Sequence, residues 1–171
     1  MSGLLYVLAR HGQESAHQLD YHPESQIMVH MSPASYLRHC AATTTPAEWE
    51  RFMERVDNSL GSSRMLALKG RLLAQEPLDA LFLDADPFTG AVVSQEGQHR
   101  AFLAQSLGIA LVPVLVFARI RHRFASEAEA PGWRSRLRAL FDEAPLLSGQ
   151  VSAALSAERA AYHPDAEPLD V

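Results

Sequence analysis

The sequence predicts a single-domain α/β protein, and three observations support this fold class. Short apolar runs with the length of buried strands occur at residues 27–31, 79–84 and 111–118. A capped amphipathic helix is indicated from Thr45. Residues 92–116 follow the order strand, glycine turn, helix, strand. The length of 171 residues fits one domain, which would bury roughly two-thirds of its unfolded surface.

The composition is that of an ordinary soluble globular protein, with 47% hydrophobic residues, 20% charged residues and a net charge of −5. This charge argues against a uniformly basic protein that coats nucleic acid. Cys40 is the only cysteine, which excludes a disulfide framework and a cysteine-rich metal cluster, and we predict no metal ligands. We find no run of 18 apolar residues and no signal segment, so we expect a cytoplasmic protein without a membrane partner.

The first part of the chain is predicted to contain an extension, a strand and a helix. Residues 1–25 form an N-terminal extension whose second half is polar and without periodicity, and a strand is expected at residues 27–31. Ser32 is a helix-capping residue and Pro33 suits the first helical position. The helix that they begin carries Tyr36, Leu37 and Cys40.

The strongest helix start is at Thr45, which caps the helix, with Pro46 in the first position and Glu48 completing a capping box. Residues at helical spacing follow, and we expect Trp49 and Phe52 in the core, with Met53 and Val56 continuing the pattern. A break rich in glycine and serine is predicted at residues 58–63. Residues 66–74 have a helix-like pattern but no cap, which leaves this segment ambiguous.

The second part begins with a predicted hairpin and ends with helices. Residues 86–90 form a turn between a buried strand and a strand at residues 91–94. An Ala-rich helix is expected at residues 150–162, after an amphipathic helix marked by Trp133, Leu137, Leu140 and Phe141. We therefore divide the chain into an extension (1–25), a domain (26–125), a C-terminal helical segment packing on it (126–162) and a loose tail (163–171).

The glycine turn at residue 97 is the most informative feature for function. It delivers His99 and Arg100 to the first turn of a helix, where several backbone N–H groups have no partner within the helix. Those donors, the positive end of the helix dipole and a guanidinium together form a site for a phosphate or a carboxylate.

The run Glu96-Gly97-Gln98-His99-Arg100, the preceding hairpin and the following Leu-Gly-Ile-x-x-Val-Pro-Val segment resemble the ParB/sulfiredoxin-like superfamily, which includes ParB-like nuclease domains. The match is best over residues 79–117 and extends more loosely back to Val29. The resemblance is to stand-alone members of the phage or plasmid type. It implies a small mixed sheet flanked by helices, with a Gly-x-His-Arg turn at the start of one helix.

The resemblance implies that Gly97, Gln98, His99 and Arg100 bind ATP, another nucleotide or a phosphorylated small molecule. Some relatives hydrolyse nucleotides or cut DNA with Mg²⁺, and in that version Glu96, His99 and Arg100 are catalytic. Glu96 would then orient Arg100, hold a metal through the phosphate or act as a base. The resemblance leaves open whether the chain is a hydrolase or only binds its ligand.

Two departures narrow what the resemblance implies. Gln98 occupies the position of the catalytic cysteine of sulfiredoxins, and Cys40 lies outside the motif, so sulfiredoxin chemistry is excluded. Residues 119–171 are too few for both the DNA-binding domain and the dimerisation tail of chromosome-partitioning members.

Two other functions remain open from the sequence. A non-catalytic accessory factor of a phage or plasmid would bind DNA or a protein through Arg119, Arg121 and Arg123, with Arg134, Arg136 and Arg138 extending the basic face. A histidine phosphatase would use His11, which lies in an Arg-His-Gly segment. That fold needs a second histidine in a Ser-His-Gly context, which we do not find.

Each of these signals also has a purely structural interpretation. Arg100 would only form an ion pair with Asp84 or Asp86, and His99 would only cap a neighbouring strand. The arginines after residue 118 would form a solvated charge run, because no aromatic residues alternate with them to stack on bases.

Overall fold

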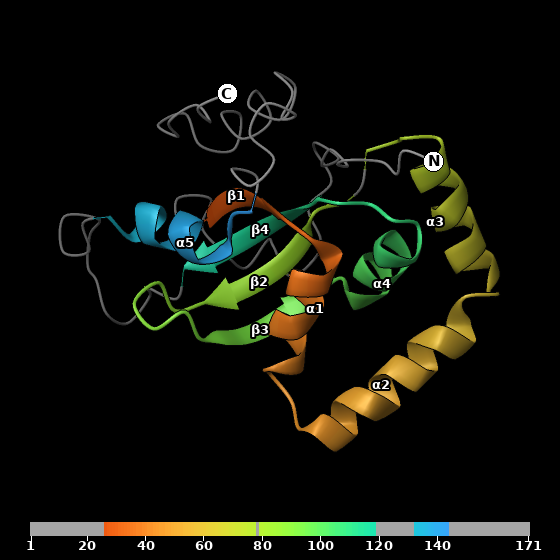
Figure 1. The fold of residues 1–171 in the computed structure, drawn as a ribbon, viewed down its shortest axis with the longest axis horizontal. Helices are drawn as coiled ribbons and strands as arrows, with labels where there is room; N and C mark the ends of the chain where they lie inside the picture. Colours follow the sequence, from red (N-terminus) through yellow and green to blue (C-terminus); the bar gives the residue numbers. More distant parts are fainter. Residues whose placement is uncertain (1–25, 78, 119–131, 144–171) are drawn as a thin grey trace.

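The centre of the molecule is a four-stranded sheet with the strand order β1-β4-β2-β3 (Figure 1). The structure is a computed structural model that describes residues 26–77, 79–118 and 132–143. The strands are β1 (Gln26–Met31), β2 (Leu81–Ala85), β3 (Val92–Glu96) and β4 (Val112–Ala118). β4 is antiparallel to β1 and parallel to β2, which is antiparallel to β3. The sheet is therefore mixed, and the predicted α/β class is confirmed.

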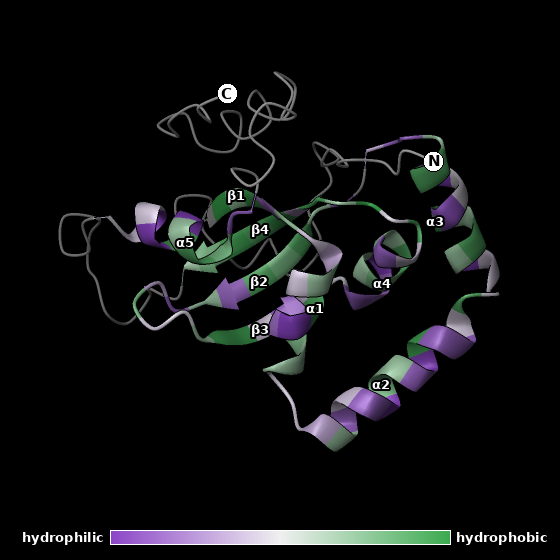
Figure 2. Ribbon diagram, in the orientation of Figure 1, coloured by the Kyte–Doolittle hydropathy of each residue, from purple (hydrophilic) through white to green (hydrophobic). Residues whose placement is uncertain are grey.

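Five helices accompany these strands in the described ranges: α1 (Pro33–Ala41), α2 (Pro46–Ser59), α3 (Ser63–Leu73), α4 (Gln98–Ser106) and α5 (Trp133–Phe141). Alternate residues of the sheet form one core with side chains of α1, α3, α4 and α5. The strands are the most apolar part of the ribbon in Figure 2, whereas α2 carries many hydrophilic residues and buries only Val56. Residues on the other face of the sheet form a smaller buried cluster: Met28, Phe82, Leu115 and Phe117.

The helix starts at α1 and α2 are as predicted. Ser32 caps α1 by accepting a hydrogen bond from the backbone N–H of Ser35 at 3.1 Å. The capping box of α2 is complete, because Thr45 accepts from the Glu48 N–H and the Glu48 carboxylate accepts from the Thr45 N–H. These bonds satisfy donors that a helix leaves open at its N-terminus.

α3 resolves the ambiguous segment and corrects two predictions. The segment is a helix and it does have a cap, since Ser62 accepts a hydrogen bond from the Met65 N–H at 3.3 Å. This cap lies inside the segment that was predicted as a break. The break itself is shorter than predicted, because α2 continues to Ser59 and α3 begins at Ser63. A serine between two helices suits a loop and a cap equally well, which is why the pattern alone was ambiguous.

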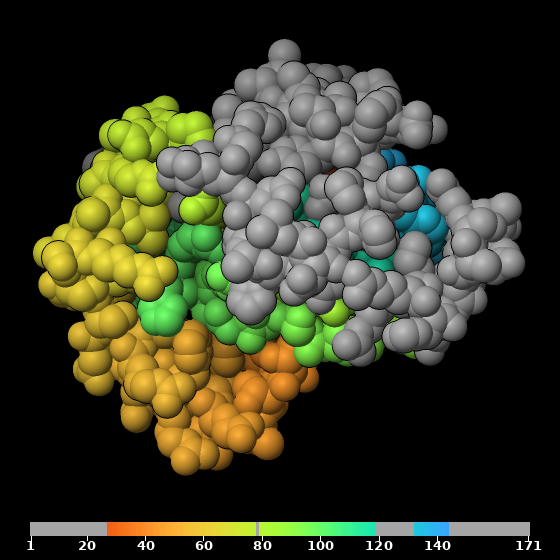
Figure 3. All heavy atoms as spheres, turned by 180° about the vertical axis from the view of Figure 1, so that it is seen from behind, coloured from red at the N-terminus to blue at the C-terminus, as the bar shows by residue number. Residues whose placement is uncertain are grey.

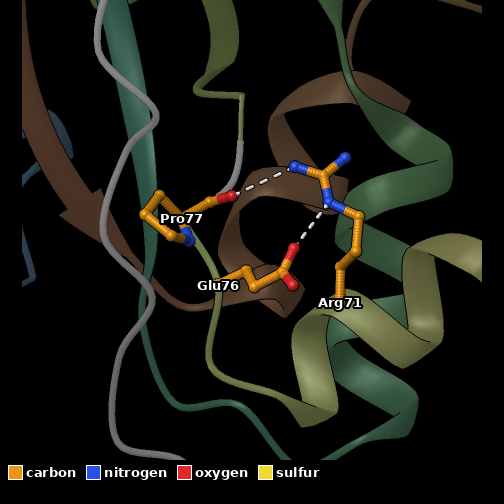
Figure 4. Close-up of polar contacts among 3 residues, drawn as sticks. All are labelled: Arg71, Glu76 and Pro77. Carbon is orange, nitrogen blue, oxygen red and sulfur yellow. Dashed lines mark hydrogen bonds and ion pairs between the residues drawn. The ribbon is translucent and has the colours of Figure 1, made fainter.

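The chain leaves α3 through a turn that Arg71 holds (Figure 4). Its Nε lies 3.1 Å from a carboxylate oxygen of Glu76, and Nη2 donates to the carbonyl oxygen of Pro77 at 3.3 Å. Both side chains of the ion pair are exposed, at 38% and 53%. We therefore expect it to contribute no more than about 1 kcal/mol.

α5 packs on the sheet through Trp133, Leu137 and Phe141, which are all buried. Leu140 was predicted on this face, but it is 47% exposed. Its side chain lies over the β2–β3 turn at Gly90, where a Cβ would be 3.4 Å from the nearer methyl group of Leu140.

The residues after α5 join the sheet to α1. The Glu143 carboxylate accepts from the Ser32 N–H at 2.6 Å and from the Ser35 hydroxyl at 3.0 Å. The neighbouring Asp142 accepts from the His30 N–H at 3.1 Å. A carboxylate at the N-terminus of α1 is also favoured by the helix dipole.

Several predictions fall outside the described residues. These are the extension at residues 1–25, the helix at residues 150–162 and the tail at residues 163–171. In the described ranges, no helix combines the length and apolarity that a membrane span requires.

Tyr36 connects α1 to the β2–β3 hairpin, and removal of its hydroxyl is predicted to destabilise the protein. Its ring is fully buried, and the hydroxyl is shared between the carbonyl oxygens of Phe82, at 3.1 Å, and Glu96, at 2.5 Å. Tyr36→Phe keeps the ring but leaves buried acceptors without this donor. We expect a loss of about 1–3 kcal/mol in the free energy of unfolding.

Urea unfolding followed by circular dichroism measures this loss. The variant should have the wild-type m-value, so that the lower midpoint reports stability alone. A midpoint equal to that of the wild type would contradict the role given to the hydroxyl.

Candidate functional site

The candidate site is the turn between β3 and α4. Gly97 is the N-cap of α4 and has a backbone φ of 122°, which residues other than glycine rarely adopt. A Cβ on Gly97 would lie 2.8 Å from Cγ of Leu81 and 3.0 Å from Nη2 of Arg100. Gly97 is therefore required both for its backbone conformation and for the close packing of the turn.

The first turn of α4 has open backbone donors. The first of its N–H groups with a partner inside the helix is that of Ala101, which donates to the Gly97 carbonyl at 2.9 Å. The N–H groups of Gln98, His99 and Arg100 make no hydrogen bond within the described ranges, and Gly97 has no side chain to cap them. These donors and the helix dipole favour an anion at this end of α4.

The guanidinium of Arg100 folds back over Gly97. Its Nε is buried and has no hydrogen-bond partner. Within the described part of the chain, Arg100 forms no ion pair, so the alternative in which it only pairs with Asp84 or Asp86 is wrong. Arg100 therefore places a positive charge without an ion-pair partner beside the open N–H groups of α4.

His99 is exposed and lies against two other elements. Its ring centroid is 5.6 Å from that of Phe52 on α2, with an angle of 82° between the rings. Burial of part of the ring and the positive charge of Arg64 on α3 lower the pKa of His99 below its usual value of 6.5. Arg64 was not identified from the sequence, since nothing in its local pattern relates it to the glycine turn.

The core beneath the turn contains Tyr36 and Cys40. Burial raises the pKa of Tyr36 well above 10, and the nearby charge of Arg100 acts in the opposite direction. Burial also raises the pKa of the Cys40 thiol to about 12. Because the thiolate is the reactive form, Cys40 is not a nucleophile at neutral pH.

Glu96 lies on the other face of the sheet from α4. It is paired with Phe82, and directly opposed residues of neighbouring strands share a face. Phe82 belongs to the small cluster opposite the helix-covered core. The backbone of Glu96 thus leads into the turn, but its side chain leaves the strand on the face of the sheet opposite Arg100. No hydrogen bond or ion pair joins these two side chains within the described ranges.

The described residues do not form a Mg²⁺ site made of protein side chains alone. They contain no group of three acidic, histidine or cysteine side chains arranged to hold a metal. Mg²⁺ is usually held by one or two carboxylates together with phosphate oxygens and waters. Glu96 is the carboxylate next to the turn, and its side chain leaves the strand on the face of the sheet opposite α4.

The other predicted site residues are not part of this turn. Arg119, Arg121, Arg123 and His11 lie outside the described residues. On α5, the guanidinium of Arg134 lies 4.6 Å from the ring centroid of Trp133, and that of Arg136 lies 4.6 Å from the ring centroid of Phe88. These two arginines therefore already contact aromatic rings within the protein.

Trp49 and Phe52 were both predicted in the core, and this is only partly correct. Both are half-buried. Trp49 packs against the core. The ring of Phe52 stacks on Trp49 and also contacts the ring of His99. The helical spacing correctly identified the inward face of α2, but part of that face meets the first turn of α4.

No family model, no curated protein and no solved structure matches the chain.

Gly97→Ala is predicted to destabilise the protein, because the added Cβ would clash with Leu81 and a residue with a side chain is strained at φ 122°. We expect a loss of about 1–3 kcal/mol for the strain, with the clash adding to it. Gly70→Ala in α3 is the matched control, since a Cβ there meets nothing within 4 Å. The control is expected to gain roughly 0.5–1 kcal/mol.

Urea unfolding of the two variants measures both changes. Equal stability of Gly97→Ala and the wild type would contradict the geometry described for the turn.

The pKa of His99 is predicted to respond to Arg64. NMR titration should place the pKa of His99 below 6.5, and Arg64→Gln should raise it, because one cause of the lowering is removed. His39 is an internal reference, since burial and the charge of Arg38 lower its pKa. Arg38→Gln should raise the pKa of His39 and leave that of His99 unchanged. A pKa of His99 that is the same in the wild type and Arg64→Gln would contradict the placement of α3 beside α4.

Proposed function

We propose that the protein binds a nucleotide or another phosphorylated small molecule at the N-terminus of α4. The observation that carries this proposal is the guanidinium of Arg100, which is folded over Gly97 and forms no ion pair in the described part of the chain. A guanidinium without a carboxylate partner is a strong donor for phosphate oxygens. A phosphate would contact its terminal nitrogens, because Nε itself is shielded from the solvent.

The surroundings of Arg100 support an anionic ligand. Three backbone N–H groups of the first turn of α4 are open on one side. The charge of Arg64 adds cationic character, and His99 adds a ring nitrogen that can donate a hydrogen bond. The space-filling view shows α2, α3 and α4 forming one continuous surface (Figure 3). A planar guanidinium binds two phosphate oxygens in a forked geometry that a lysine cannot reproduce. The resemblance to the ParB/sulfiredoxin-like superfamily implies the same ligand class.

The described residues support binding and not a hydrolytic step. Phosphoester hydrolysis needs a group that orients water or a metal beside the phosphate. Glu96 was predicted for this role, but its carboxylate starts from the face of the sheet opposite α4. The proposed function is therefore ligand binding, with Gly97, His99 and Arg100 at the site.

A thermal-shift panel of ATP, ADP, CTP, GTP and inorganic phosphate tests this proposal. A ligand at a hundred times its Kd should stabilise the protein by about 2.7 kcal/mol, which is roughly 5–10 °C for a chain of this size. We expect Arg100→Ala to abolish the shift and Arg100→Lys to retain only part of it. Arg136→Ala is the matched control, because that arginine lies on α5 over Phe88, and its shift should equal that of the wild type.

The absence of a shift with every ligand in the wild type would overturn the proposal. A shift of equal size in the wild type and in Arg100→Ala would show that the ligand binds elsewhere on the protein. Once binding is established, a turnover assay compares the wild type with Glu96→Gln. Loss of turnover with unchanged affinity in the variant would support the interpretation of the protein as a hydrolase.

A further inference from the structure

We infer that the ligand carries a nucleobase, which stacks in the corner formed by the rings of His99 and Phe52. This inference rests on the phosphate-binding function proposed above and names the second half of the same ligand. It assigns a recognition role to α2, a helix outside the glycine turn.

The corner is built from a chain of three rings. Trp49 and Phe52 stack with ring centroids 5.4 Å apart and an angle of 29°. Phe52 and His99 are 5.6 Å apart and nearly perpendicular, at 82°. Two perpendicular rings in contact form a right-angled corner. A planar base that stacks on one ring presents its edge to the other, which is the favoured arrangement for aromatic groups.

These rings lie at the boundary between the core and the solvent. Val56 is the buried residue of α2, while Trp49 and Phe52 are half-buried and His99 is exposed. Trp49 packs against the core on one side. Phe52 therefore lies between the core-facing tryptophan and an exposed histidine, at the edge of the solvent.

The same rings lie beside the proposed phosphate site. His99 is the second residue of α4, so it contributes both a backbone N–H to the open first turn and a ring to the corner. Arg100 is the next residue, and the charge of Arg64 reaches His99 from α3. A nucleotide joins a phosphate and a base through one sugar, so a single small molecule could contact both parts. Aromatic rings next to cationic side chains are the combination that proteins use for bases and their phosphates.

The imidazole of His99 can also distinguish bases through hydrogen bonds. A neutral imidazole has one nitrogen that donates and one that accepts. Either nitrogen can bond with the edge of a base that stacks on Phe52. An apolar ring alone would stack on every base with little preference.

Calorimetry with paired ligands tests the inference. The probes are adenosine and cytidine 5′-monophosphates, with ribose 5-phosphate as the ligand that has the phosphate and sugar but no base. Stacking on one aromatic ring is expected to strengthen binding by about 5-fold to 150-fold. The wild type should therefore bind at least one nucleotide more tightly than ribose 5-phosphate by a factor in this range.

Phe52→Leu removes the ring but keeps an apolar side chain. It should bring the affinity for the nucleotide down to that for ribose 5-phosphate, and leave the affinity for ribose 5-phosphate unchanged. Phe88→Leu is the matched control, because Phe88 is a 38% exposed phenylalanine on the β2–β3 turn. It should retain the wild-type preference for the nucleotide.

Tryptophan fluorescence gives a second measurement that needs no change at Phe52. Trp49 stacks on Phe52, whereas the other tryptophan, Trp133, is buried in the core. A nucleotide should change the emission of the wild type, and ribose 5-phosphate should not. Trp49→Phe should lose this signal while it still binds the nucleotide in the calorimeter.

The outcomes separate this inference from the proposed function. If the wild type binds ribose 5-phosphate and the nucleotides equally well, the base corner is overturned and the phosphate site remains. If Phe52→Leu weakens both classes of ligand by the same factor, Phe52 is only structural and the base corner is overturned. If no phosphorylated ligand binds, both proposals fail together.

Discussion

The site depends on one buried hydroxyl, that of Tyr36. It is shared by the carbonyl oxygens of Phe82 on β2 and Glu96 on β3, and it thereby ties α1 to both strands of the hairpin. Glu96 immediately precedes Gly97, so the last anchored residue of the sheet is adjacent to the turn. A buried phenol that lost these acceptors would be costly, because no water replaces them in the core. The direction in which the chain leaves β3 is thus set by α1.

The geometry of the turn follows from that anchor. Gly97 lies between Leu81 below it and the guanidinium of Arg100 above it, with no room for a Cβ. Close packing on the apolar side holds the first turn of α4 against the core, while its backbone donors remain open on the other side. The packing of the turn on the core and the position of its backbone donors therefore depend on each other. A change in packing at Leu81 would move the donors as well.

α2 and α3 complete the surroundings of the turn, although they contribute little to the core. α2 buries only Val56, and α3 buries Met65 and Leu72. Trp49 of α2 and Leu68 of α3 also pack against the core from its edge. Both helices meet the first turn of α4 as well, through the ring of Phe52 and the charge of Arg64. Side chains of α2 and α3 that remain at the boundary with the solvent can contact a ligand, whereas buried side chains cannot. The same two helices would account for both charge and stacking at the proposed site.

Local signals in the chain were enough to predict the capped starts at Ser32 and Thr45, the hairpin and the glycine turn at Gly97. Each of these depends on hydrogen bonds and backbone angles within a few residues, so neighbouring side chains carry the information. The strand order, the partner of Phe52 and the face on which Glu96 lies were not accessible in this way. Periodicity identifies a face but not what it packs against, because that depends on how segments distant in sequence cover the sheet. The candidate anion site could therefore be located from the chain, whereas its neighbours could be identified only from the fold.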